Sequence, residues 1–312
     1  MKLDLLESLP CPALFRDGGI KMNTPMQKLL GTEEAALLLN SVPAGEKKPL
    51  MLGGKTYRAL LSDRGLLLLV PEAEEEEEEE PSLSLLSAGL RDAVSTALLA
   101  ASGLRKQKDP VSHRYAGPLS RSLDRVVRII DNLRIESLES RDAMKEENLI
   151  PVLTEIVDGI NAGLGTDAAE LRIEPGDAYL VCSRELIASL VMNLTVEALL
   201  PAGGKVSVFL RPGKIYALDF LLPLGHDARE EWEELLFSRK GRGTAFAAVR
   251  RIVALHEGGI FLREEEGKLL VHVTLSRRLR VGADVFAPAS LYQGGDFVYM
   301  MLSPLERRLE RE

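Results

Sequence analysis

Cysteine and tryptophan are scarce in this chain of 312 residues, which contains two cysteines and one tryptophan. Cys11 and Cys182 lie far apart, and neither has a neighbour at the spacing of metal ligands. This pattern argues against a disulfide framework and against a zinc site, and it is typical of proteins in a reducing compartment. We therefore expect a cytoplasmic protein.

Long apolar runs and excess positive charge are also missing. Apolar runs such as residues 66–70 are far too short to cross a bilayer. No basic stretch followed by an apolar one opens the chain, so we expect neither a membrane span nor a secretory signal. The net charge is −8, and an acidic chain is poorly suited to binding the phosphate backbone of nucleic acid.

The chain is long enough for two or three domains, and its clearest boundary is a run of seven consecutive glutamates at residues 74–80. Carboxylates at this density repel one another and cannot be buried together, so residues 72–81 are predicted to form a solvated acidic linker. Binding of a basic partner to this run is the alternative.

Residues 1–71, before the linker, are predicted to form a small α+β unit. A turn at residues 17–19 separates two apolar segments, and apolar segments on both sides of Gly53-Gly54 indicate a β-hairpin. The arrangement resembles a shortened PAS sensor domain. That resemblance implies sensing, and a structural or dimerising role fits the same residues.

Two helical stretches follow the linker, with a break at Asp109-Pro110. Apolar residues recur at spacings of three and four in both stretches. A single helical hairpin over residues 82–143 cannot cover its own apolar face, so we predict that it pairs with a second copy as a dimeric four-helix bundle. The apolar positions are Leu83, Leu86, Leu90, Ala93, Ala97, Ala101 and Leu104 in the first stretch, and Leu119, Leu123, Val126, Ile130 and Leu133 in the second.

Alternating helices and strands over residues 146–279 predict an α/β sandwich. A glycine-containing loop at residues 241–243 leads into its last helix, and such a loop directs backbone N–H groups at a phosphate. Helices are expected at 149–163, 185–200 and after Gly243, and strands at 178–182, 205–210, 214–222, 259–263 and 269–275.

The C-terminal extension, residues 280–312, contains an apolar segment at 297–302. An added strand or helix on the α/β unit is expected there, followed by a short charged helix that begins at Ser303-Pro304. A segment that docks onto a partner is the alternative.

This order of parts resembles that of a bacterial sensor histidine kinase, over residues 82–279 and with the PAS-like unit upstream. The resemblance implies a multidomain α+β fold: a small PAS-like domain, an antiparallel helical hairpin that forms a dimeric four-helix bundle, and an α/β sandwich of the GHKL type, as in histidine-kinase ATPase domains. It also implies ATP and Mg²⁺ as cofactors and a response regulator as partner.

The phosphoacceptor motif of such kinases, Ser-His-Glu-Leu-Arg-x-Pro-Leu, corresponds to residues 87–94 of this chain. Leu90 and Arg91 match, but the position of the histidine holds Ala88, whose methyl group cannot act as a nucleophile. The second candidate is His113, which begins another Ser-His-x-x-x-x-Pro-Leu pattern. Only one helix follows it before the α/β unit, so we interpret His113 as a residue of the hairpin turn or of a helix start.

The nucleotide-binding helix of these kinases carries Asn-x-x-x-Asn-Ala, whose second Asn supplies oxygen to Mg²⁺. The matching residues are Asn193 and Glu197, and the spacing of four places both on one helix face. Glu197 remains able to bind Mg²⁺ through its carboxylate, although it brings negative charge towards a polyanion. Two polar residues on a partly exposed helix face are the alternative interpretation.

The first glycine box of the family, Asp-x-Gly-x-Gly, holds adenine through its carboxylate and corresponds to residues 223–227. Gly225 matches, but Pro223 stands in place of the aspartate and Asp227 in place of the second glycine. Shifting the alignment to use Asp219 removes both glycines. The adenine-binding carboxylate is therefore predicted to be missing.

The second glycine box, Gly-x-Gly-x-Gly, corresponds to residues 241–245. Gly241 and Gly243 remain, and Ala245 replaces the third glycine. Arg242, together with Arg239 and Lys240, is able to attract an anion, and solvated surface cations are the alternative. The nucleotide-binding residues implied by the resemblance are Asn193, Glu197, Gly225, Gly241, Arg242 and Gly243.

The polar groups of kinase chemistry are altered together, whereas the apolar framework is retained. We therefore interpret the chain as a catalytically degenerate, histidine-kinase-like protein of two-component signalling, a pseudokinase with weak or absent binding of ATP and Mg²⁺. It would act as a homodimeric adaptor or regulator that binds a response regulator or another kinase. The alternative is an active, divergent ATP-dependent kinase, or a phosphotransferase that needs no ATP, with another acceptor such as His113.

Overall fold

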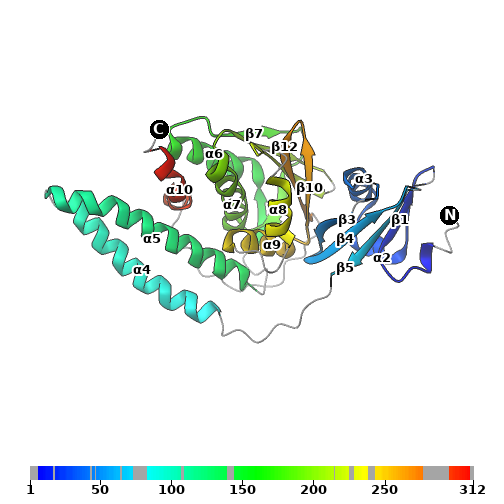
Figure 1. Ribbon diagram of the computed structural model, residues 1–312, viewed down its shortest axis with the longest axis horizontal. Helices are drawn as coiled ribbons and strands as arrows, with labels where there is room; N and C mark the ends of the chain where they lie inside the picture. Colours follow the sequence, from blue (N-terminus) through cyan, green and yellow to red (C-terminus); the bar gives the residue numbers. More distant parts are fainter. Residues whose placement is uncertain are drawn as a thin grey trace.

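The computed structural model describes residues 6–16, 18–42, 44–45, 47–63, 65–72, 83–106, 109–138, 144–213, 215–224, 228–237, 243–276 and 295–309. An N-terminal α+β unit, a long helical hairpin and a larger α/β unit follow one another along the chain (Figure 1). Within these residues, every helix is too short or too polar to cross a membrane.

The N-terminal unit is an antiparallel sheet in the order β2-β1-β5-β4-β3, with two short helices. Asn23 connects sheet and helix: its fully buried side chain accepts the N–H of Met26 at the start of α2 and the N–H of Ala13 in β1. The predicted hairpin across Gly53-Gly54 is confirmed. The elements are β1 (Ala13–Arg16), β2 (Ile20–Met22), α2 (Thr24–Leu29), α3 (Thr32–Ser41), β3 (Lys47–Leu52), β4 (Lys55–Leu61) and β5 (Leu66–Pro71).

The helical hairpin consists of α4 (Leu83–Lys106) and α5 (Pro110–Glu136), which pack against each other. The break predicted at Asp109-Pro110 is confirmed. Asp109 caps α5 by accepting the N–H of Ser112, and Pro110 occupies the first turn, where the missing N–H is not needed.

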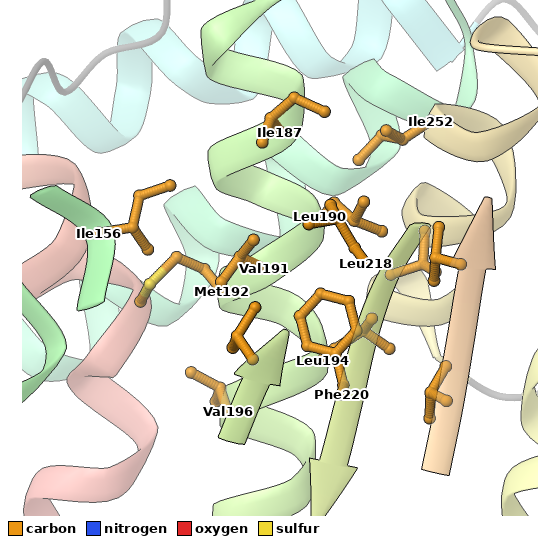
Figure 2. Close-up of a cluster of buried hydrophobic side chains, with 14 of the residues drawn as sticks. Ile156, Ile187, Leu190, Val191, Met192, Leu194, Val196, Leu218, Phe220 and Ile252 are labelled. Carbon is orange, nitrogen blue, oxygen red and sulfur yellow. The ribbon is translucent and has the colours of Figure 1, made fainter. Parts of the chain in front are cut away.

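The α/β unit packs α6, α7 and α9 on one face of the strands β11-β12-β10-β9-β7. Side chains alternate along β10, and Leu218 and Phe220 point towards Leu190 and Leu194 of α7 (Figure 2). The elements are β6 (Lys145–Asn148), α6 (Leu149–Leu164), β7 (Ala169–Ile173), β8 (Tyr179–Cys182), α7 (Arg184–Ala202), β9 (Val206–Arg211), β10 (Ile215–Leu222), α8 (Ala228–Phe237), α9 (Thr244–Leu255), β11 (Gly259–Glu265) and β12 (Lys268–Ser276).

The predicted addition of a strand or helix to the α/β unit is confirmed as a helix, but the helix start predicted at Ser303-Pro304 is wrong. Instead of a new helix at Ser303-Pro304, a single helix, α10 (Gly295–Leu309), continues through Pro304. It packs against α5, α6 and α7. Burial of its apolar side chains against three helices stabilises α10 across the proline, which would disfavour an isolated helix.

The two units share one continuous sheet, which the sequence did not predict. Strand β3 of the N-terminal unit pairs with β11 of the α/β unit, so that ten strands form one sheet. The backbones come close because Gly259 has no side chain: a Cβ there would lie 2.9 Å from the carbonyl oxygen of Met51. Next to this pairing, the N–H of Gly53 donates to the carbonyl oxygen of Gly258 at 3.2 Å.

The substitution Gly259→Ala is expected to loosen this pairing, because the added methyl group meets backbone and not a flexible side chain. Hydrogen exchange at the Gly53 amide should become faster than in the unaltered chain. Gly103→Ala is the control, since a Cβ at Gly103 meets nothing within 4 Å. Unchanged exchange at Gly53 in the Gly259 variant would contradict the tight approach.

Candidate functional site

The candidate site lies on α7, where the sequence placed the predicted metal ligands. Ser183 caps this helix by accepting the N–H of Leu186, and most of the side chains on all sides of α7 are buried. Asn193 is completely buried, and the side chain of Glu197 is 27% exposed. The structure therefore confirms that both residues share one face of a helix, as the spacing of four predicts.

An arginine of the helical hairpin binds both Asn193 and Glu197. Nη2 of Arg128, on α5, donates to Oε1 of Glu197 at 2.6 Å and to Oδ1 of Asn193 at 3.3 Å. The neighbouring Asn132 exchanges two hydrogen bonds with Asn193, at 2.9 Å and 3.3 Å. We call these four residues, Arg128, Asn132, Asn193 and Glu197, the α5–α7 latch.

The latch brings opposite charges together where little water is present. The side chain of Arg128 is only 9% exposed, and a buried guanidinium requires an anion close by. A neutral side chain at position 197 would not supply that charge, whereas Glu197 does. The carboxylate of Glu197 therefore compensates an internal cation.

Sequence reasoning missed Arg128, because the apolar periodicity of the second helix does not include it. A signal was present in the spacing. Arg128 and Asn132 are four residues apart on α5, as Asn193 and Glu197 are on α7. Two helices that cross face to face can match two such pairs, but the sequence does not say that these helices meet.

A second contact holds α5 on the α/β unit near its C-terminal end. The guanidinium of Arg251, on α9, donates through both Nε and Nη2 to the carbonyl oxygen of Leu138, which follows α5. Helix α5 also packs along α9. The second half of α5 is thus connected to α7 through the latch and to α9 through packing and Arg251.

The structure separates the remaining predicted residues. Gly243 is the residue before α9 and has an extended backbone, with φ −165°, which any residue can adopt. Ala245 is buried in α9. Gly225, Gly241 and Arg242, together with Asp227, Arg239 and Lys240, lie outside the described residues.

Both positions considered for the phosphoacceptor are in helices. Ala88 lies in the first half of α4, and His113 lies in the first turn of α5. The predicted place of His113 at a helix start is therefore confirmed. The side chains of both residues are outside the described part of the structure.

Asp219, the alternative adenine-binding carboxylate, points away from α7. It alternates with Leu218 and Phe220 along β10 and is therefore on the opposite face of the sheet, where it is fully buried. There it accepts a hydrogen bond from Nδ1 of His272 and forms an ion pair with Arg211 at 3.0 Å. His272 lies on the same face of the sheet as Asp219, and it is only 9% exposed.

No metal-binding cluster is present in the part of the chain that the structure describes, since no three His, Cys, Asp or Glu residues gather there. The buried thiol of Cys182, just before α7, is held protonated: desolvation raises its pKa to about 12, and the charge of Glu147 adds to the effect. A thiolate ligand or nucleophile is therefore not available at this position near neutral pH.

The chain is similar in structure to sensor histidine kinases. The histidine kinase AdeS of Acinetobacter baumannii is 17% identical, with a TM-score of 0.44 over 61% of this chain and 98% of AdeS. Full-length ShkA in complex with AMPPNP is 16% identical, with a TM-score of 0.49 over 62% of this chain and 45% of ShkA. The histidine kinase domain of the E. coli osmosensor EnvZ is 21% identical, with a TM-score of 0.34 over 49% of this chain and 99% of that domain.

No protein-family model and no curated protein matches the sequence.

The strength of the charge pair in the α5–α7 latch can be measured with a double-mutant cycle of Arg128→Met and Glu197→Gln. We expect a coupling free energy of about 1 to 3 kcal/mol, below that of a fully buried pair because Glu197 retains contact with water. The readout is the free energy of unfolding by urea.

The matched control is the ion pair of Arg58 and Glu72, which has the same 2.6 Å separation but side chains 60% and 32% exposed. The corresponding cycle there should give less than about 1 kcal/mol. Equal coupling in the two cycles would show that the latch is only another surface contact.

Proposed function

We propose that the chain is a catalytically degenerate, histidine-kinase-like regulator, in which the hairpin closes the nucleotide site. The observation that carries the proposal is the guanidinium of Arg128, bound between the amide oxygen of Asn193 and the carboxylate of Glu197. A cation already fills the position for which the family motif supplies oxygen ligands to Mg²⁺.

The chemistry of the other motif positions supports the same proposal. Ala88 has no nucleophilic atom, Pro223 has no carboxylate, and the carboxylate of Asp219 is buried on the wrong face of the sheet. Phosphoryl transfer depends almost entirely on positioning the nucleotide and stabilising its charge. A site without these groups is suited to protein binding and not to catalysis.

An apolar stripe on the hairpin supports a dimer. Val111, Tyr115, Leu119, Val126 and Ile129 are between 38% and 61% exposed, and their spacing of about whole turns places them along one side of α5. An apolar stripe along a whole helix, left open to water in the single chain, is typical of an interface. We propose that two copies pair through this stripe as a four-helix bundle.

The proposed parts are a PAS-like domain at residues 1–71, the acidic linker at 72–81, the dimerisation hairpin at 82–143, the ATPase-like domain at 146–279 and the C-terminal extension at 280–312. A cytoplasmic homodimer of these parts would bind a response regulator or another kinase. The support for a protein partner is that the framework of a signalling kinase persists without its reactive groups.

Titration with ATP, with and without Mg²⁺, tests the proposed loss of nucleotide binding. The full chain should show no change in its unfolding temperature. A ligand at a hundred times its dissociation constant would add about 2.7 kcal/mol of stability, which is several degrees. A competent histidine kinase in the same assay is the positive control.

Radiolabel transferred from the γ-phosphate of ATP to the chain would overturn the proposal. Disappearance of that label in His113→Ala would identify His113 as the acceptor and establish the alternative of a divergent active kinase.

Substitution of the apolar stripe tests the dimer. Leu119→Glu should weaken association by about 3 kcal/mol or more, since a two-fold dimer carries the change twice, and raise the dissociation constant at least about 100-fold. Sedimentation equilibrium measures this constant.

The control is Ile173→Glu in β7, because Ile173 and Leu119 are both 40% exposed. If the two variants dissociate equally, or if the unaltered chain is a monomer at micromolar concentration, the proposed interface is wrong.

A further inference from the structure

The C-terminal helix α10 lies between the hairpin and the α/β unit. It packs against α5 on one side and against α6 and α7 on the other (Figure 1). The apolar side chains that it buries on these two sides have exposed fractions of only 1% to 6%. The buried apolar residues are Val298, Met300, Met301, Leu302 and Leu305.

Helix α6 is shaped to receive α10. Gly159 and Gly163 lie four residues apart on α6, and both face α10. A Cβ at Gly159 would lie 3.2 Å from the methyl carbons of Val298, and one at Gly163 would lie 2.6 Å from Cδ1 of Leu302. Glycine weakens a helix interior, so its presence at both contact points is explained by the close approach of the second helix.

The residues that α10 buries belong to the same hydrophobic core as the inner face of α5. Val127 and Ile130 of α5, which flank Arg128, share one core with Met300 and Met301 of α10. The polar latch therefore lies beside an apolar contact on the same helix. Whatever keeps α10 in place also keeps this part of α5 on the α/β unit.

We propose that α10 is an intramolecular strap that holds α5 over α7, so that Arg128 leaves Asn193 and Glu197 only when α10 is released. The proposal rests on the closed site described above and adds how that site is kept closed. Release of α10 would free the hairpin and uncover Asn193 and Glu197 of α7 together with Gly159 and Gly163 of α6. Coupling between two such contacts is reciprocal, so loss of the latch must also loosen α10.

Two variants release α10 in different ways. Gly163→Leu fills the contact point on α6 without weakening that helix, since leucine is the better helix former. Met301→Glu places a charge in the buried face of α10 and leaves α6 unchanged. Ala162→Leu is the matched control for the first, because Ala162 is the exposed neighbour of Gly163 on α6.

Hydrogen exchange of the full chain, followed by mass spectrometry without any nucleotide, is the measurement. In both releasing variants we expect amides of α10 and of the second half of α5 to exchange at least about tenfold faster. Ala162→Leu should leave both unchanged. Arg128→Met should in turn speed exchange in α10.

The proposal is overturned if α10 exchanges faster while the second half of α5 keeps its protection, or if Arg128→Met leaves α10 unaffected. Because no nucleotide is present, this result does not depend on the ATP titration. A nucleotide-binding chain could still have a strap, and a chain without a strap could still fail to bind nucleotide.

Discussion

The arrangement of this protein depends on one buried cation and the anion that compensates it. Arg128 has little access to water, and its charge is met by Glu197. Its guanidinium also donates to Asn193, which exchanges two hydrogen bonds with Asn132. Burying a guanidinium without such a partner would cost several kcal/mol, of the order of the whole stability of a domain. The position of α5 across α7 is therefore fixed by charge as well as by apolar packing.

Because Arg128 and Glu197 compensate each other, neither is easily replaced alone. A neutral residue at position 197 would leave Arg128 buried without its anion. A neutral residue at position 128 would leave the partly buried carboxylate of Glu197 without its cation. The two residues therefore cannot be replaced independently, because neighbouring charged groups are energetically coupled.

The local parts of the structure could be predicted from the sequence, because periodicity and turn chemistry act over a few residues. The helix at 149–163, the hairpin across 211–213 and the break at Asp109-Pro110 all follow from such patterns. The closed site could not be predicted in the same way. Arg128 and Glu197 are 69 residues apart in sequence, and a charged side chain on a helix surface gives no sign of whether it faces water or another helix.

The C-terminal helix shows a second limit of local patterns. Ser303-Pro304 has the composition of a helix start, yet it lies inside α10, where Ser303 is 1% exposed. Tertiary packing outweighs the local preference there. The helix α8, with its charged sequence around Trp232, was likewise not foreseen; Trp232 packs edge-on against Phe246 of α9 at a centroid separation of 5.1 Å.

The pairing of β3 with β11 has a mechanical consequence. Strands joined by backbone hydrogen bonds twist together as one sheet. A distortion of the N-terminal unit is therefore carried to the α/β unit through the pairing of β3 with β11, and this path does not pass through the glutamate run. The turn at Gly54 lies against Ala254, in the last turn of α9: a Cβ added at Gly54 would lie 3.1 Å from the Cβ of Ala254. A distortion of the first five strands would therefore press directly on α9, whose Arg251 binds the end of α5. The path from the N-terminal unit to the hairpin is shorter through space than along the chain.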